Sequence, residues 1–255
     1  MKRLLRSGVK AHADWKATVD AAFADATAFW KAARAFDRLV THGKRRGKGF
    51  AAYAPGVLPV DSKGKPIFPP VWSNDDRTRV AIAGMSDGFC AYCQSPVSSS
   101  HPGKGGEERP PGQIEHFQPK SRFPARAYDW DNYFLSCGGC NNAKSDKWPV
   151  EEYVRPDEGK PGSRFDFAET GEIAARRKGD KAAENTVDDF DLKRDWLRKH
   201  RETAIKSHLG FVATLMRLGV MKLDELLLKQ PVAFSEAINQ CVRSVWAQGR
   251  GKKKP

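Results

Sequence analysis

Hydrophobic residues recur at helical spacing towards both ends of the chain, with a different pattern in the middle. Over Ala13–Val40 apolar side chains return at three-, four- and seven-residue steps, which predicts one long amphipathic helix. A short helix is expected over Asp75–Met85. From Ala182 the pattern is again helical as far as Trp246. The leucine, valine and isoleucine stripe of these last helices indicates core or a surface that faces a partner.

The middle of the chain predicts short strands and loops. Ser98–Gly112 is rich in serine, glycine and proline, which is typical of a loop. We expect a strand over Gln113–Phe117, a returning segment over Tyr128–Leu135 and a helix over Asn141–Lys147. This order favours a ββα unit. Further on, the alternation over Ser163–Ile173 predicts a hairpin.

Four of the five cysteines form two pairs with a two-residue gap, Cys90–Cys93 and Cys137–Cys140. Such a gap lets two thiolates reach one ion, so the two pairs predict a tetrahedral structural zinc site. Two disulfides are the alternative. The chain start lacks the apolar region of a signal peptide, and no apolar run is long enough for a bilayer, which favours a reducing cytoplasm. Cys241, on a helical segment, is expected to be a small core residue.

These elements together predict an α+β protein, mainly helical, with a zinc-stapled ββα core between N- and C-terminal helices. We expect four regions: N-terminal helices with a basic loop at 1–75, the core at 76–150, the hairpin and C-terminal helices at 151–248, and a basic disordered tail at 249–255. Within the first region, the basic loop is Gly43–Gly49.

The chain is strongly basic, with 44 Lys and Arg against 31 Asp and Glu, a formal net charge of +13. A surplus of this size favours a polyanionic partner, because each neutralised phosphate releases counterions. Charge alone does not distinguish a protein that binds a polyanion from a soluble basic protein without such a partner.

The stretch between and after the cysteine pairs carries residues suited to phosphodiester hydrolysis. That reaction needs an activated water and a divalent cation that relieves charge on the phosphate. His116 can take the proton from water, and the oxygens of Glu115 and Asn141 are hard donors for Mg²⁺ or Mn²⁺. Because Glu115 and His116 are neighbours on a strand, their side chains point to opposite faces unless the strand is locally distorted. We therefore expect a distortion there if both serve one site.

Three other residues extend this candidate site. Lys144 lies three residues after Asn141, on the same helix face, where its ammonium can meet a phosphate. Asn132 can bridge backbone groups and hold the segment of the histidine in place. Lys120 is a second candidate for binding the substrate.

The motifs CAYC, QIEHFQPKSRFP and YDWDNYFLSCGGCNNAKSDKWP resemble those of HNH endonucleases with zinc-binding CxxC pairs. More narrowly, they are similar to the PtuB-like HNH proteins of Septu anti-phage systems and of some retrons. The resemblance is strongest over Gly88–Pro149. Many members have Asp where this chain has Glu115, and His where it has Asn141.

The resemblance implies a role for each matching position. The general base falls on His116, the metal-binding acid on Glu115, the second metal ligand on Asn141 and the middle asparagine on Asn132. It also implies structural zinc on the four cysteines, a catalytic Mg²⁺ or Mn²⁺, a nucleic-acid substrate and an SMC-like (PtuA-like) ATPase partner.

Two function classes remain in competition. The first is a metal-dependent endonuclease, the effector of an anti-phage defence system; DNA is favoured as its substrate, and the sequence leaves RNA open. The alternative is a zinc-stapled nucleic-acid-binding adaptor with a vestigial nuclease site, which has no need of Glu115, His116 and Asn141 together. A zinc deaminase is excluded, because its H-x-E and P-C-x-x-C motifs do not occur.

Overall fold

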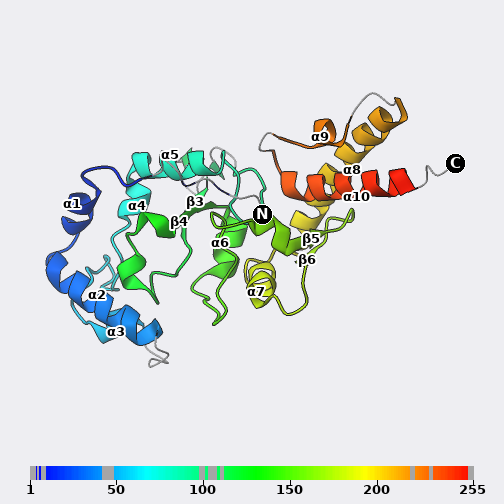
Figure 1. The fold of residues 1–255 in the computed structure, drawn as a ribbon. Helices are drawn as coiled ribbons and strands as arrows, with labels where there is room; N and C mark the ends of the chain where they lie inside the picture. The colour runs from blue at the N-terminus through cyan, green and yellow to red at the C-terminus, as the bar shows by residue number, and fades with distance from the viewer. Residues whose placement is uncertain are drawn as a thin grey trace.

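The computed structural model describes residues 4, 6, 10–41, 49–97, 101–102, 108–109, 112–218, 222–229 and 232–251. In this part of the chain, helices are joined by short antiparallel strand pairs, which confirms the predicted α+β, mainly helical class (Figure 1). The helices are α1 Trp15–Asp20, α2 Ala26–Thr41, α3 Phe50–Tyr53, α4 Val71–Asn74, α5 Asp76–Met85, α6 Gly138–Lys144, α7 Lys181–Asp189, α8 Asp195–Leu218, α9 Leu223–Leu226 and α10 Ser235–Gly251. The strands are β1 His101–Pro102, β2 Glu108–Arg109, β3 Gln113–His116, β4 Tyr133–Ser136, β5 Phe165–Phe167 and β6 Ile173–Ala175.

The single long helix predicted at the N-terminal end is wrong, because the segment forms two helices, α1 and α2. The carboxylate of Asp25 accepts a hydrogen bond from the backbone N–H of Ala28 at 2.9 Å, which satisfies a free donor at the start of α2. The Trp30 indole then donates to Asp20 at 2.8 Å and holds α2 against the end of α1. The helix predicted over Asp75–Met85 is present as α5, with Asp75 as its N-cap.

The central hairpin β3–β4 separates two hydrophobic cores. It pairs antiparallel, with Glu115 opposite Phe134 and His116 opposite Tyr133. Tyr133 belongs to a core formed with the N-terminal helices, while Phe134 belongs to a core shared by the cysteines and the C-terminal helices. Since neighbouring residues of a strand face opposite sides, the hairpin contributes the side chains of one face to each core.

Helix α6 follows β4 directly and completes the ββα unit, but it begins at Gly138, three residues before the predicted start. Cys137 is its N-cap, and the Cys137 sulfur accepts a hydrogen bond from the N–H of Cys140 at 3.5 Å. Asn141 is therefore the fourth residue of the helix and not its first. The helix ends at Lys144, short of the predicted Lys147.

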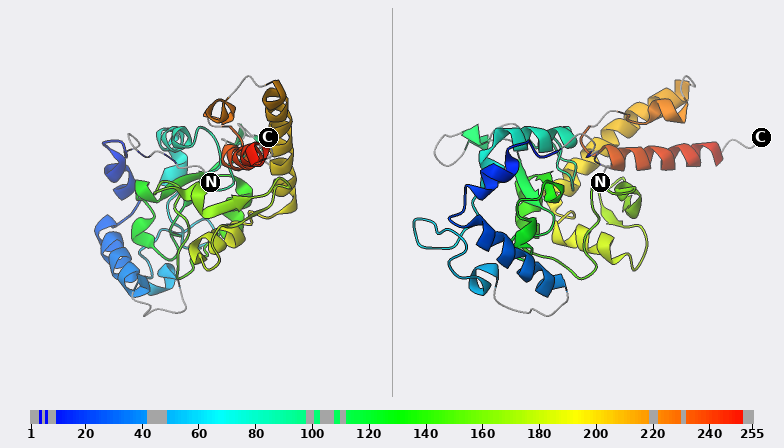
Figure 2. Two further views of the ribbon diagram at one scale, coloured as in Figure 1. Left: turned by 45° about the vertical axis from the view of Figure 1, so that its right-hand side comes forward. Right: turned by 60° about the vertical axis from the view of Figure 1, so that its left-hand side comes forward.

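The C-terminal region contains the predicted hairpin, β5–β6, followed by helices α7 to α10. Helices α8 and α10 lie side by side and extend away from the rest of the molecule (Figures 1 and 2). Helix α10 continues to Gly251, three residues into the expected tail, and residues 252–255 lie outside the described part. None of the described helices is long and apolar enough to cross a membrane.

Two predicted loops fall largely outside the described residues. Of the basic loop Gly43–Gly49, only Gly49 is described. Within the expected loop Ser98–Gly112, strands β1 and β2 pair antiparallel, and the residues between them are not described. The assignment of four regions along the chain stays a prediction.

Candidate functional site

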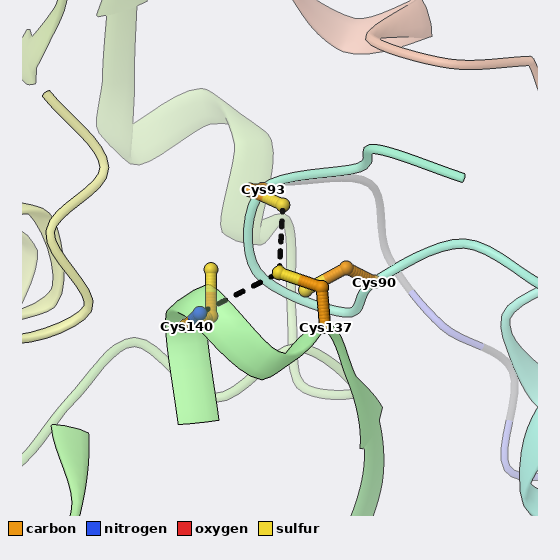
Figure 3. A group of neighbouring side chains, drawn as sticks. All are labelled: Cys90, Cys93, Cys137 and Cys140. Atoms are coloured by element: carbon orange, nitrogen blue, oxygen red, sulfur yellow. Dashed lines mark hydrogen bonds between the residues drawn. The ribbon is translucent and has the colours of Figure 1, made fainter. Parts of the chain in front are cut away.

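The four paired cysteines converge, as Figure 3 shows. Their sulfur atoms all lie within 4.8 Å of one another, and those of Cys93 and Cys137 are 3.7 Å apart. Four sulfurs around one zinc ion at about 2.3 Å would be separated by about 3.8 Å. The cysteines are free, so this cluster can hold a metal ion such as zinc.

Further contacts surround the sulfurs of this cluster. The Ser95 hydroxyl lies 2.8 Å from the sulfur of Cys93, and the Ser136 hydroxyl lies 3.8 Å from that of Cys90. Hydrogen bonds from the other three cysteines, that of Cys140 first, hold the pKa of Cys137 well below its usual value. Burial, first of all, raises the pKa of Cys90, and the hydrogen bond with Cys137, first of all, raises that of Cys140, so the case for a metal site rests on the convergence of the four sulfurs.

Glu115 lies on the face of β3 that is covered by α6. Its carboxylate is 1% exposed, and both oxygens are engaged: Oε1 accepts from the ammonium of Lys144, and Oε2 accepts from the hydroxyl of Tyr92. The Lys144 ammonium, equally buried, also donates to the backbone carbonyl of His116 at 2.6 Å. The expectation that Lys144 faces a phosphate is therefore not met in the structure, because its charge is paired internally.

His116 lies on the opposite face of β3, where its side chain packs against Trp72 and Tyr133 of the core formed with the N-terminal helices. Its Nε2 is 2.9 Å from the carbonyl oxygen of Ala127. Because a carbonyl only accepts, Nε2 carries the hydrogen and Nδ1 keeps its lone pair. The Trp72 ring packs nearly perpendicular to the imidazole, with ring centroids 4.5 Å apart, and His116 is 7% exposed.

The protonation state of His116 follows from these surroundings. Burial, followed by the positive charge of Lys120, holds the pKa of the imidazole well below its usual value of 6.5. The ring is therefore neutral at physiological pH, which is the form that can accept a proton.

The distortion expected in β3 is absent. Every residue of β3 is described, and each pairs one-to-one with a residue of β4, without a bulge. Glu115 and His116 therefore point to opposite sides of the hairpin. Lys144 links the two faces at this point, because its ammonium reaches both the Glu115 carboxylate and the His116 carbonyl.

The three remaining candidates lie around this hairpin. Asn132 is fully buried and bridges the backbone as expected: its Oδ1 accepts from Gln118 N–H at 2.7 Å, and its Nδ2 donates to the carbonyls of Gln118 and Arg126 at 3.0 and 2.9 Å. Asn141 donates to the Gln113 side chain at 2.5 Å, on the face of β3 that carries Glu115. Lys120 lies over the Trp72 ring, 5.1 Å from its centroid.

Three contacting residues were missed by the sequence reasoning. Tyr92 lies inside the CAYC motif, in which only the cysteines were predicted to have a role. Trp72 covers His116 from a helix 44 positions earlier in the chain, and Arg194 donates to two cysteine sulfurs from more than 50 positions later. No local pattern marks Trp72 or Arg194, although Tyr92 could have been considered for its place between two ligands.

Comparison with known proteins agrees with this geometry. Residues 90–147 match the family model described as HNH endonuclease. The matched part comprises the ββα unit beside the four-cysteine cluster, with Glu115-His116 on its first strand, and is similar to an HNH endonuclease domain. This confirms the resemblance found in the sequence.

The chain is also similar to two proteins named Septu protein PtuB. The first, from Bacillus mycoides (strain KBAB4), is 25% identical over 188 residues, covering 61% of this chain and 60% of that protein. The second, from Bacillus thuringiensis, is 32% identical over 66 residues, covering 26% of this chain and 23% of that protein. The chain thus matches less than two thirds of the length of either relative.

Proposed function

We propose that this chain is a metal-dependent endonuclease that hydrolyses nucleic-acid phosphodiester bonds, acting on DNA rather than RNA. The observation that carries the proposal is the setting of His116 within an HNH domain. Its ring is oriented by the Ala127 carbonyl and is neutral, and the contacts within the described residues leave Nδ1 available, as a general base requires. Asn132 supports this role by holding the loop that follows the histidine.

In this mechanism Nδ1 of His116 accepts the proton of the attacking water. Glu115 and Asn141 would hold Mg²⁺ or Mn²⁺, which relieves charge on the phosphate when bound. Because Glu115 and His116 point to opposite sides of the regular hairpin, this mechanism requires β3 to distort when metal and substrate bind. The donor set fits a hard cation, since it combines a carboxylate with a carboxamide. In the structure Glu115 Oε1 accepts from the Lys144 ammonium and Oε2 from the Tyr92 hydroxyl, so a bound metal ion would have to replace one of these partners.

The test is cleavage by the purified full chain, with plasmid DNA and total RNA side by side. We expect cleavage with Mg²⁺ or Mn²⁺ and none in EDTA under conditions that leave structural zinc bound. His116→Ala should lose about 100-fold or more of the rate while keeping fold and nucleic-acid binding. The matched control is His200→Ala, since His200 is exposed on α8. Full cleavage in EDTA would refute the metal assignment.

A second candidate is the adaptor with a vestigial nuclease site. The burial of His116, and the pairing of both Glu115 oxygens within the protein, favour it. Intact nucleic-acid binding by the wild type, with no cleavage above that of His116→Ala in the presence of Mg²⁺ or Mn²⁺, would support the adaptor and exclude the nuclease.

We further propose that the chain is the nuclease effector of an anti-phage defence system, working in the cytoplasm with an SMC-like, PtuA-like ATPase. Its similarity to the two Septu proteins supports this. In the N-terminal helices the apolar residues Trp15, Phe29 and Phe36 are buried. Exposed apolar residues remain on α8, namely Trp196, Phe211 and Leu218.

Co-expression with the product of a neighbouring ATPase gene tests the partner. We expect a stable complex, which Phe211→Asp with Leu218→Asp should weaken while zinc content stays unchanged. A well-behaved monomer with full activity, and no ATPase gene beside its own, would refute the partnership and leave a stand-alone nuclease.

A further inference from the structure

Arg194 directs its guanidinium at the second cysteine pair. Its Nη2 lies 3.6 Å from the sulfur of Cys137 and 3.5 Å from that of Cys140, and its Nη1 lies 3.6 Å from the sulfur of Cys140. These are hydrogen-bond distances for a sulfur acceptor. Both sulfurs of this pair thus share one cation, which comes from the residue that precedes α8.

The surroundings hold the guanidinium in this place. Nη1 also donates to the carbonyl oxygens of Asp191 at 2.8 Å and Phe190 at 3.3 Å, in the turn that leads to α8. On the other side lies Gly139, where a Cβ atom would be 3.2 Å from the Arg194 Cζ. Any larger residue at 139 would crowd the guanidinium, so glycine there leaves the room that Arg194 uses.

The negative charge of a four-thiolate zinc centre would be stabilised by this contact with a cation. Four thiolates around Zn²⁺ leave an excess of two negative charges, and burying them without compensation is costly. The first pair, Cys90 and Cys93, is contacted by the neutral hydroxyls of Ser136 and Ser95. Among the described residues, Arg194 alone is seen to donate from a charged group to these sulfurs.

We propose that Arg194 is a positioning residue of the zinc centre. Its guanidinium is the counter-ion of the Cys137 and Cys140 thiolates, and it fixes the second pair for the ion. Because Arg194 belongs to the start of α8, the same contact ties the C-terminal helices to the nuclease core. The proposal rests on the assignment of zinc to the four cysteines, and it is independent of which reaction the chain performs.

The test measures zinc retention by the full chain, without reference to cleavage. Wild type, Arg194→Gln and Arg194→Lys are purified with zinc, and transfer of zinc to a coloured chelator is followed. Removing a group that orients a metal ligand typically costs 10- to 100-fold in affinity. We expect Arg194→Gln to release zinc about tenfold faster than wild type, and Arg194→Lys to fall between them.

The matched control is Arg217→Gln, an exposed arginine on the same helix, which should behave as wild type. Gly139→Ala provides a second route, because it crowds the guanidinium without removing its charge, and it should also speed zinc release. If Arg194→Gln is recovered unfolded, added Zn²⁺ should restore its far-ultraviolet circular dichroism.

Three outcomes would overturn the proposal. A rate for Arg194→Gln within twofold of Arg217→Gln would show that the guanidinium does not support the centre. An unfolded Arg194→Gln that zinc does not restore would make Arg194 a packing residue. Wild type without bound zinc would remove the centre itself, whatever its nuclease activity proves to be.

Discussion

The ammonium of Lys144 and the carboxylate of Glu115 form an ion pair in which each side chain is 1% exposed. The second carboxylate oxygen accepts a hydrogen bond from the Tyr92 hydroxyl, so both oxygens of Glu115 have partners within the protein. Tyr92 lies between Cys90 and Cys93, and Lys144 lies four residues after Cys140. Both groups that hold the candidate acid are therefore carried by the two cysteine-bearing segments.

Breaking this pair should strongly destabilise the protein. Lys144→Met leaves an unpaired carboxylate in a buried site, which we expect to lower the free energy of unfolding by about 3–5 kcal/mol. Denaturant titration measures the change. The double variant Lys144→Met, Glu115→Leu should recover much of the loss, because it removes both charges. A single variant as stable as wild type would show that the pair is open to water.

Loss of one cysteine ligand should remove metal and structure together. Cys140→Ser is expected to abolish bound zinc and to disorder the segment around 88–149, because the ligands hold both turns. Elemental analysis and limited proteolysis measure the two effects. Cys241→Ser is the control, since Cys241 is buried far from the cluster in sequence and is not part of it. Zinc content unchanged in Cys140→Ser would refute the four-cysteine site.

The lowered pKa of His116 predicts a loss of stability in mild acid. The unfolded chain takes up a proton on this imidazole below about pH 6.5, whereas the folded chain resists it. Stability therefore falls as pH drops through that value, by up to about 1.4 kcal/mol per pH unit from this group. Melting temperatures at pH 7.5 and 5.5 measure it, and His116→Gln should show a smaller difference than wild type.

The same shift predicts the acid side of the cleavage profile. An unperturbed imidazole loses its basic form below about pH 6.5, but His116 should keep it at lower pH. Rates measured at pH values where the protein remains folded should therefore hold below 6.5. A profile that falls with a midpoint at 6.5 would mean that His116 becomes exposed during the reaction.

Asn132 should contribute to the site through the backbone it holds. Asn132→Ala removes three hydrogen bonds to Gln118 and Arg126 at a fully buried position. Leaving those backbone groups unpaired is expected to cost about 1–3 kcal/mol each where no water replaces the bond. Thermal unfolding measures the loss, and cleavage should fall with it. Asn132→Asp, which keeps the shape and one acceptor, should lie between.

Short-range patterns predicted much of this molecule. Strand alternation and the cysteine gaps were sufficient for the ββα order and for the convergence of Cys90, Cys93, Cys137 and Cys140. They failed where a single side chain decides a boundary, as when Asp25 starts a second helix or Cys137 starts α6 early. They also failed where partners lie far apart, since Arg194 is 54 and 57 residues from the sulfurs it contacts.

The hairpin β3–β4 belongs to both halves of the molecule, and this limits how the chain can be divided. A fragment of residues 76–150 would carry the whole HNH motif, yet it would present Tyr133 and Leu135 to water on one side and Phe134 on the other. All three are buried in the complete chain. The segment that matches the HNH model therefore depends on both of its flanking segments, which cover the two faces of its hairpin.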